Sequence, residues 1–498
     1  MTKLEEILKF EDIDKKISML KSARTTPQPN VSTLRKEWDA DKHDVNNRAI
    51  RKERKVLIKE EYTDEGGVFH AAVYQDEDVN RISLPIEQDI TNIHVSFMVG
   101  TDPTISYVPN DQKEEELYKV IKSVNNDNKI KYHNKRIVRS WLSETEIVEY
   151  WYAVKDAGFW SKLVARIKQI FTGNVKPQTK LKCAIWSPFR GDTLYPFFDE
   201  TGDYVAQSRE YKMKEFDQEV TYFQTVTQDE VFVWRKEKNG WVVVPDRTFK
   251  HEFPKLPCIY ARRDNSLCHY IQSMRNRLEK LMSNYADCID YHFFPYLILD
   301  GMLSGENGLG KQDERRRLIS MENGGKAYYL TWEQTPETIR LEMDSLWDKI
   351  YSMTNTPRIS FDNLRSAGQV ASGIAFKYMF MGTHLAVENH AEVIGEFLQR
   401  RYNFLASAIG SICPSLEDAA QSINLDVEIV PYTIDNLSDK LDIVHKAIDA
   451  GLMSKQSAMI FVGLTDNIEE EKELIEEENK QSGKEPKSLP VEQKKVEE

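Results

Sequence analysis

The sequence predicts an α+β protein built of several parts, because strand patterns and helix patterns occupy different stretches of the chain. The 498 residues suggest about three domains. Residues 145–262 hold short β-branched and aromatic segments with turn residues between them, which is typical of strands. Beyond residue 268, apolar residues recur at spacings of three and four, which indicates long helices.

The composition excludes several classes of protein. Hydrophobic residues make up 40% and charged residues 30%, which permits a packed core. Lys and Arg number 67 against 80 Asp and Glu, a net charge of −13, so the chain as a whole is not suited to hold nucleic acid tightly. Five scattered cysteines without C-x-x-C indicate a reducing compartment. The N-terminus lacks the apolar segment of a signal peptide, so we expect a soluble intracellular product.

The first half of the chain is expected to be peripheral and then strand-rich. Residues 1–90 are highly charged and predict short helices and loops. Within 145–262, Asn239-Gly240 predicts a hairpin turn. An insertion at 158–171 has an apolar helical face and basic residues elsewhere. We interpret it as a surface helix packed on its own sheet, with a membrane-binding or partner-binding helix as the alternative.

From residue 268 the pattern predicts two striped helices around a small insert. The first stripe runs from Ile271 to Ile289 and stops before Pro295. Short strands at 295–301 and 326–332 enclose a polar loop, and Thr335-Pro336-Glu337 opens a second striped helix. A helix pair with two apolar stripes cannot cover both by itself, so we expect it to pack between neighbouring copies in a ring.

The remainder predicts a loop followed by helices. A loop with Pro357 and Gly368 spans 355–371, and a long helix runs from Ser372 to about Ile409. A strand is expected at 426–432. Short helices should follow at 437–450, 454–462 and 466–480. The last eighteen residues have no apolar face and should be disordered.

No segment predicts a catalytic, cofactor-binding or metal-binding site. Residues 305–311 fit G-x-x-x-x-G-K, but Gln312 stands where a phosphate-binding loop needs Ser or Thr for Mg²⁺. His384 and His390 lie six residues apart, so they do not share one face of a helix as metal ligands would. We therefore expect neither an enzyme nor a cofactor.

One tight basic cluster lies on the insert between the striped helices. It consists of Lys311, Arg315, Arg316 and Arg317. Such a run is usually solvated, but its place at the tip of a two-helix stalk favours the docking of a partner.

Four stretches together resemble a known family: 251–265, 270–301, 350–380 and 449–478. The most specific is 353–376, which carries a Thr-Pro and, further on, a Ser-Gly before the long helix. The chain resembles the portal proteins of tailed bacteriophages, of the type found in long-tailed siphoviruses. The similarity covers roughly residues 90–480 at the level of pattern, and Phe376 departs mildly from the usual leucine-like residue.

The resemblance implies a ring-forming subunit with wing, stem, clip and crown. Residues 1–90 would be a charged periphery that matches nothing in the family, and 481–498 a disordered tail. The other parts would be a wing at 91–268 and 372–435, stem helices at 269–293 and 336–354, a clip at 294–335, a tunnel loop at 355–371 and crown helices at 436–480.

The resemblance also implies a function without enzymatic activity. Twelve copies would form a ring at one capsid vertex and serve as the channel for DNA packaging and ejection. The clip would dock the large terminase subunit and later the head–tail adaptor, and the ring would contact the major capsid and scaffolding proteins. Double-stranded DNA would pass without sequence-specific contacts. The protein would assemble in the host cytoplasm and reside in the virion, with no integral membrane segment.

Residues of the tunnel loop would line the DNA channel in such a ring, and Lys311 with Arg315–Arg317 would dock terminase. The expected channel residues are Pro357, Arg358, Arg365, Ser366, Gly368, Gln369, Ser372 and Gly373. Acidic channel walls would repel DNA phosphates and keep the duplex from sticking.

Two alternatives belong to other classes of protein. Residues 305–311 motivate a nucleotide-dependent packaging enzyme. The basic amphipathic segment 158–171 motivates a membrane-associated scaffold.

Overall fold

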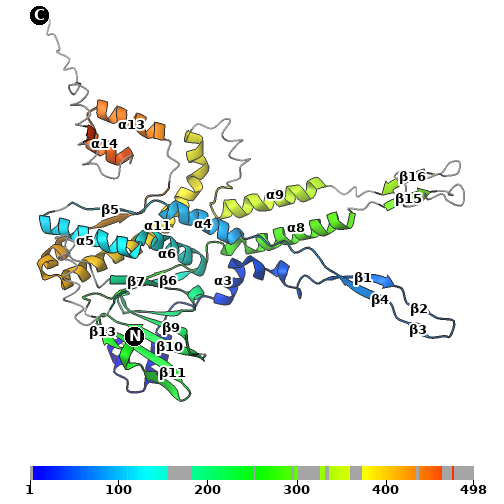
Figure 1. Ribbon diagram of the computed structural model, residues 1–498, viewed down its shortest axis with the longest axis horizontal. Helices are drawn as coiled ribbons and strands as arrows, with labels where there is room; N and C mark the ends of the chain where they lie inside the picture. Colours follow the sequence, from blue (N-terminus) through cyan, green and yellow to red (C-terminus); the bar gives the residue numbers. More distant parts are fainter. Residues whose placement is uncertain are drawn as a thin grey trace, which may run out of the picture. The chain divides into compact units, whose positions relative to one another are not determined.

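The computed structural model describes residues 4–475 apart from 109, 155–180, 217, 252, 293–295, 301–325, 331–335, 359–372, 433–436 and 463–473. The chain divides into two compact units (Figure 1). The larger comprises Met1–Leu364 and Met379–Tyr432, and the smaller comprises Arg365–Tyr378 and Thr433–Glu498. The smaller unit contains the short helices α13 (Leu437–Asp449) and α14 (Lys455–Val462), which match the predicted helices at 437–450 and 454–462.

Three short helices begin the larger unit: α1 (Leu4–Leu8), α2 (Ile13–Ser22) and α3 (Val31–Trp38). Asp12 caps α2 by accepting hydrogen bonds from the backbone N–H groups of Asp14 and Lys15. Ile7 of α1 and Ile17 of α2 are buried against Phe223 and Trp234 of the sheet described below. These helices therefore cover part of the core.

A long β-ribbon follows, which the sequence did not predict. Its strands are β1 (Arg54–Lys59), β2 (Tyr62–Thr63), β3 (Phe69–His70) and β4 (Val73–Glu77). β1 pairs with β4 and β2 pairs with β3, all antiparallel. The expectation of helices and loops over 1–90 is thus wrong for 54–77.

The predicted strand-rich region folds into two antiparallel sheets. The larger sheet has the order β12-β11-β10-β9-β8, with β13 also paired to β11. Its strands are β8 (Thr193–Phe198), β9 (Tyr204–Glu215), β10 (Gln218–Val226), β11 (Glu230–Glu237), β12 (Gly240–Val243) and β13 (Phe249–Lys250). Gly240 has φ of 132° where β11 turns into β12, so the predicted Asn-Gly hairpin turn is confirmed.

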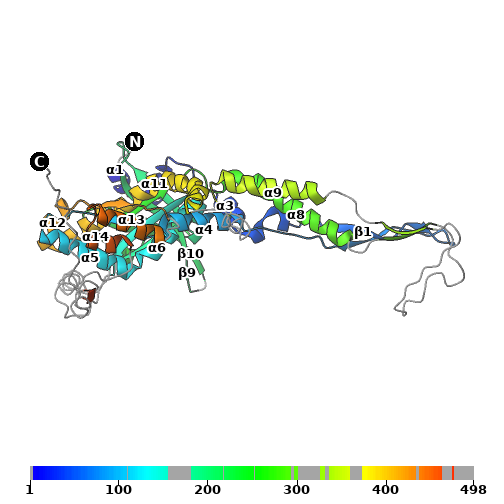
Figure 2. The same cartoon turned by 90° about the horizontal axis from the view of Figure 1, so that it is seen from above.

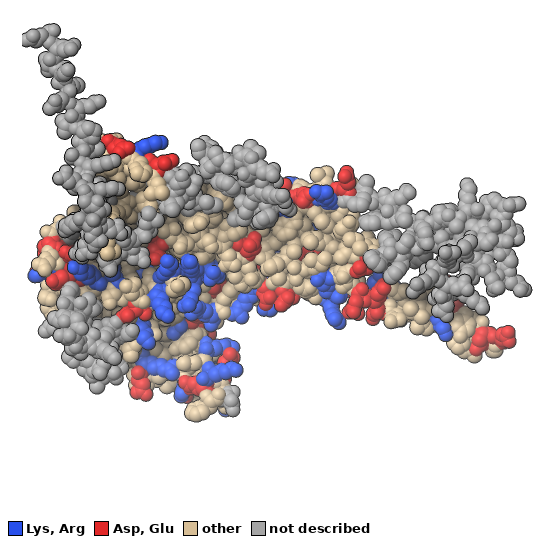
Figure 3. Space-filling model, turned by 45° about the horizontal axis from the view of Figure 1, so that its top comes forward, with Lys and Arg blue, Asp and Glu red and all other residues tan. Residues whose placement is uncertain are grey.

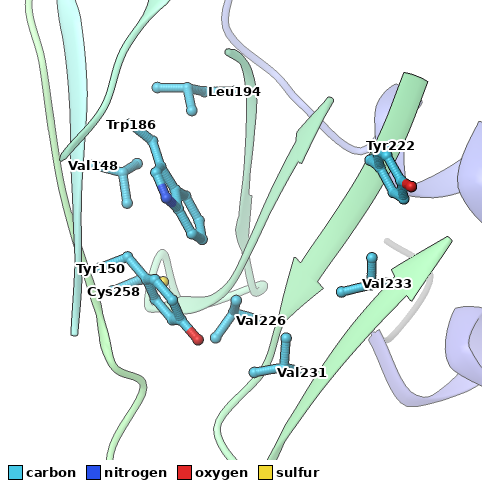
Figure 4. Packing of buried hydrophobic residues seen from close by; sticks show 9 residues of the cluster. All are labelled: Val148, Tyr150, Trp186, Leu194, Tyr222, Val226, Val231, Val233 and Cys258. Carbon is cyan, nitrogen blue, oxygen red and sulfur yellow. The ribbon is translucent and has the colours of Figure 1, made fainter. Parts of the chain in front are cut away.

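The smaller sheet has the order β14-β6-β7, with strands Cys258–Arg262, Glu146–Ala153 and Leu181–Trp186. A shared apolar core joins the two sheets (Figure 4). Val148, Tyr150 and Trp186 come from the smaller sheet, and Leu194 and Val226 come from the larger. Burial of these side chains fixes the two sheets against each other.

Further helices of the larger unit are α4 (Ile86–Val99), α5 (Gln112–Asn128), α6 (Ile130–Glu144), α11 (Gly373–Ile412) from Met379 onward, and α12 (Glu417–Ser422). The helix predicted from Ser372 corresponds to α11. α6 was not predicted. The expected strand at 426–432 is shorter, since β17 covers Asp426–Glu428 and pairs with β5 (Thr104–Ser106).

The predicted helix–insert–helix is present. α8 (Gln272–His292) leads to β15 (Tyr296–Asp300), and β16 (Lys326–Leu330) leads to α9 (Pro336–Met353). β15 and β16 pair antiparallel, from Tyr296↔Leu330 to Asp300↔Lys326. α8 and α9 lie side by side in both views (Figures 1 and 2).

Some expectations lie outside the described residues. They are the helix at 158–171, nearly all of the helix at 466–480, and the tail at 481–498. Within the part of the chain that the structure describes, none of the helices combines the length and the apolar character needed to cross a membrane.

Candidate functional site

The α8–α9 pair is the centre of the candidate site. Leu278 of α8 and Ile350 of α9 are buried together with Ile86 and Ile90 of α4. The central residues of the two predicted stripes therefore cover each other and α4 within one chain, whereas the packing of the stripes between neighbouring copies stays a prediction. Part of the stripes stays exposed, with Ile289 43% and Met353 59% accessible.

A buried network of ionisable groups holds α8 at its N-terminal half. Nδ1 of His43 lies 2.6 Å from Oε1 of Glu279, and the same oxygen accepts a hydrogen bond from the Leu84 backbone N–H. Arg275 bonds to Glu87 of α4 through Nε (3.1 Å) and to Glu279 through a terminal nitrogen (3.4 Å). These four side chains are almost wholly buried. Because each carboxylate has a basic partner, the network fixes α8 against α4.

The chain leaves α9 through a tightly held segment, Thr354–Asn355–Thr356, which we call the loop root. Oγ1 of Thr354 donates to the Ile350 carbonyl at 2.9 Å, and the backbone N–H of Thr356 donates to the Tyr351 carbonyl at 2.9 Å. Asn355 adopts φ of 52°, a left-handed conformation that Asn tolerates better than most residues. Both threonines are buried. The predicted tunnel loop therefore starts from an ordered base.

Two helices, α4 and α11, form hydrogen bonds with the loop root. Nε2 of His94 in α4 lies 3.0 Å from the Thr354 carbonyl oxygen and 3.0 Å from Oγ1 of Thr356. Thr383 of α11 donates through Oγ1 to the Asn355 carbonyl at 2.7 Å. The root thereby ties α9 to α4 and to α11, the helix that follows the loop.

The His94 imidazole has a defined protonation state. A carbonyl oxygen only accepts hydrogen bonds, so Nε2 must carry the hydrogen that it donates to Thr354. Burial lowers the pKa of His94 to about 4, although the bond to Thr354 acts in the opposite direction. His94 is therefore neutral at pH 7, and its Nδ1 is buried without a hydrogen-bond partner among the described residues.

Three of the predicted channel residues fall within the described part of the chain: Pro357, Arg358 and Gly373. Pro357 follows the loop root. Arg358 lies back against α9, where its guanidinium is 3.3 Å from Asp348 and 5.8 Å from the Trp347 ring centre. Gly373 is the first residue of α11. The remaining predicted residues lie outside the described residues, namely Arg365, Ser366, Gly368, Gln369 and Ser372, and in the insert Lys311, Arg315, Arg316 and Arg317.

The two histidines considered as metal ligands have separate surroundings. The His390 ring packs against Trp141 (5.5 Å between centres) and His94 (5.7 Å), whereas the His384 ring packs edge-on to Phe97 (5.6 Å). Burial lowers the pKa of His390 to about 3, and Arg263 and His94 add to the effect. Both rings act in packing.

A different trio, His133, Glu149 and Cys183, brings three possible metal-ligand atoms within 4.8 Å of one another. Glu149, however, already forms a 2.8 Å ion pair with the fully buried Arg401. Burial raises the pKa of Cys183 to about 12, so its sulfur is a neutral thiol and a poor metal ligand. We interpret the trio as a structural cluster that joins β6 and β7 to the helices α6 and α11.

The acidic excess is not spread evenly. In the face shown in Figure 3, Lys and Arg side chains gather on one part of the surface, with Asp and Glu scattered around them. Among the exposed basic residues are Lys131 and Arg136 of α6. The net charge of −13 thus coexists with local basic surface.

The hydrogen bonds from His94 and Thr383 to the loop root were not predicted from the sequence. The pattern Thr-Asn-Thr-Pro at 354–357 is itself a signal for a hydrogen-bonded turn, since Thr and Asn side chains bond to nearby backbone and Pro ends the helix. Nothing local marks His94, which lies 260 residues before Thr354.

The fold and this site define a class of protein: a mixed α+β subunit with a helical stalk, a strand insert at one end of it and an anchored loop at the other. The model of a protein family, phage portal protein, SPP1 Gp6-like, matches residues 29–485. The chain therefore belongs to the phage portal protein family, as the resemblance implied.

Two solved structures have similar chains. One is the neck of an empty GTA particle computed with C6 symmetry, with a TM-score of 0.42, 10% identity, and coverage of 77% of this chain and 91% of the other. The second is the neck of a native GTA particle computed with C12 symmetry, with a TM-score of 0.41, 9% identity, and coverage of 90% and 99%. No curated protein matches the chain.

Proposed function

We propose that twelve copies of this chain form a ring at one vertex of a phage capsid and that DNA enters and leaves through its channel. The supporting observation is the loop root: in a member of the portal family, α4 and the long α11 are both bonded to the base of the loop that follows the stalk helix α9. A loop anchored at its base can change position without disturbing the ring.

In this proposal the parts have distinct tasks. The sheets with α4–α6 and α11 form the wing, α8 and α9 form the stem, and α13 and α14 belong to the crown inside the capsid. The insert between α8 and α9 is the clip. Lys311 and Arg315–Arg317 bind the large terminase subunit there, and the head–tail adaptor binds later. Scaffolding and major capsid proteins contact the outside of the ring, and the virion is the final location.

The DNA passes as a non-specific polyanion. Acidic wall residues repel phosphates, and the basic loop residues Arg358 and Arg365 touch them transiently. No cofactor and no catalysis are needed for this role. We expect the purified protein to show no ATP turnover, and Lys311→Ala to change nothing in that assay.

The test of the channel role replaces residues 359–371 by a Gly/Ser linker of equal length and leaves the loop root intact. Rings should still form, because the root and the stalk are unchanged, while particles should protect a different amount of DNA from nuclease. The same linker in place of 481–493 is the control and should leave packaging normal. Normal packaging with the loop replaced would refute the role of the loop.

A further inference from the structure

The ribbon from β1 to β4 is exposed on both faces and carries several large, exposed apolar side chains among its charged residues. All residues of β1 except Val56, and all of β4, are exposed. Leu57 is 43% accessible and its cross-strand partner Tyr74 59%, while Phe69 near the tip reaches 63%. An isolated two-stranded ribbon is at best marginally stable in water. A partner must therefore cover these side chains.

The base of the ribbon is fixed to the C-terminal half of α8. Arg51 bonds through its guanidinium to Asn284 and Asp287, and Asp287 also accepts from the Asn80 backbone N–H at 2.7 Å. The Ile82 backbone N–H donates to Oγ of Ser283 at 2.9 Å. The two chain segments that enter and leave the ribbon are thus both held by one helix.

A second open ribbon starts from the same end of α8. β15 begins at Tyr296, just beyond His292, and pairs only with β16 among the described strands. β1–β4 and β15–β16 are separate two-stranded sheets, so among the residues that the structure describes both keep unpaired backbone edges. Four strand edges at one end of the stalk are available to another molecule.

The charges of the strands indicate which molecule that is. β1 (RKVLIK) carries only basic charges and β4 (VYQDE) only acidic ones, while β15 ends with Asp300 and β16 begins with Lys326. Each ribbon thus has one basic and one acidic strand. A two-fold contact between like edges would place equal charges together, whereas a head-to-tail contact pairs opposite charges. Identical copies in a ring meet head to tail.

We propose that the β4 edge of one copy pairs with the β16 edge of a second copy, so that the ribbon links neighbouring subunits at the insert end of the stalk. This inference rests on the proposed ring, since copies with parallel stalks bring these two edges to the same level. The contact pairs the open β4 and β16 edges and joins two marginal hairpins into a four-stranded intermolecular sheet, in which the exposed side chains of β4 gain cross-strand neighbours.

Cross-linking tests the contact directly. Gln75→Cys on β4 and Ala327→Cys on β16 are combined in a Cys288→Ser background, because Cys288 is an exposed native thiol. A short bismaleimide should convert the rings into covalent dimers and longer multimers on a denaturing gel. Either new cysteine alone should give none, and Lys214→Cys on β9 with Ala327→Cys is the remote control. Cross-links confined to single chains, or none, would overturn the proposal.

A charge swap tests the edge argument without weakening the ribbon itself. Arg54 pairs with Glu77 and Lys55 with Asp76 across the strands, so swapping both pairs (Arg54→Glu, Lys55→Glu, Asp76→Lys and Glu77→Lys) keeps each pair but changes β1 from +3 to −1 and β4 from −2 to +2. We expect the concentration needed for half-maximal assembly to rise about tenfold, since like charges then meet across the contact. An unchanged assembly midpoint would contradict the proposal.

Serine substitutions test the contribution of the exposed apolar side chains of the ribbon, and a second pair of substitutions is the matched control. Leu57→Ser with Tyr74→Ser should impair assembly and leave the circular dichroism of the single chain unchanged, because both side chains are exposed in it. Val242→Ser with Val243→Ser, at similarly exposed positions on β12, should assemble normally. If the wild-type chain never forms rings, the proposed function fails; if it forms rings that the ribbon variants leave unaffected, only this inference fails.

Discussion

At the scale of single residues, His94 at the loop root makes the stability of the fold depend on pH. Its pKa falls from the usual 6.5 to about 4 in the folded chain because of burial. Between these two values the unfolded imidazole binds a proton and the folded one does not, so stability is complete above pH 6.5 and declines as the pH falls toward 4. Below pH 4, the resulting loss in the free energy of unfolding is on the order of 3 kcal/mol. His390 acts in the same direction.

We predict that His94→Gln removes roughly half of the acid-induced loss that the two histidines cause between pH 6.5 and 4. The Gln amide nitrogen can still donate to the Thr354 carbonyl but does not titrate. His94→Leu should instead lower stability by about 1–3 kcal/mol at pH 7.5, since it leaves the loop root without its donor. Urea unfolding at several pH values measures both effects. Equal pH profiles for wild type and His94→Gln would show that His94 does not titrate as described.

The buried Arg401 gives a second prediction at this scale. Burial opposes the charged form of Glu149, but Arg401 and His133 outweigh it and lower the pKa of that carboxyl group. Arg401→Leu leaves a buried carboxylate without its cation and should cost about 3–5 kcal/mol. Glu149→Leu combined with Arg401→Leu should cost clearly less than Arg401→Leu alone. Thermal unfolding compares the variants, and a double variant less stable than the single one would contradict the assignment.

At the scale of elements, the ribbon depends on its base. Asp287→Ala removes the acceptor of both Arg51 and the Asn80 backbone N–H. We expect trypsin to cut at Arg51, Lys52 and Arg54 several-fold faster in the unassembled chain, because loss of this partly buried anchor lowers the free energy of local opening. Asp287→Asn keeps an acceptor for Asn80 and should be intermediate. Identical cleavage rates in all three proteins would show that the base does not depend on Asp287.

The stalk helices and the strands of the insert could be predicted because their signals are local. Ile271 to Ile289 and Ile339 to Met353 repeat every three or four residues, and Pro336 marks where α9 begins. The ribbon could not be predicted in the same way. A segment such as RKVLIK is charged at both ends and apolar in the middle, so its apolar and polar residues do not alternate. Alternation arises when one face of a strand is buried, and this ribbon is exposed on both faces.

The contacts of the site escape prediction for a different reason. Arg401 and Glu149 are 252 residues apart, and His94 and Thr354 are 260 apart. Each partner is an ordinary polar residue in its own segment. Their meeting follows from how α4, α6 and α11 pack, which no local pattern contains. The Thr-Asn-Thr-Pro sequence is a local signal for a turn, but no local signal predicts that α4 and α11 contact it.

At the scale of the whole molecule, the net charge of −13 has a different meaning after the structure is considered. It excluded a chain that binds DNA over its whole surface, and it remains compatible with a conduit. The exposed basic residues of α6 show that the sign of the surface varies locally. The two open ribbons, with one basic and one acidic strand each, use charge for head-to-tail contact between copies.

The central claim is the ring, and the mass of the purified protein in solution tests it most directly. Twelve chains of 58.0 kDa amount to about 700 kDa, a closed cyclic assembly. Native mass spectrometry should find that species, and electron-microscope images should show a ring with a central channel. A protein that stays strictly monomeric at high concentration would contradict the account.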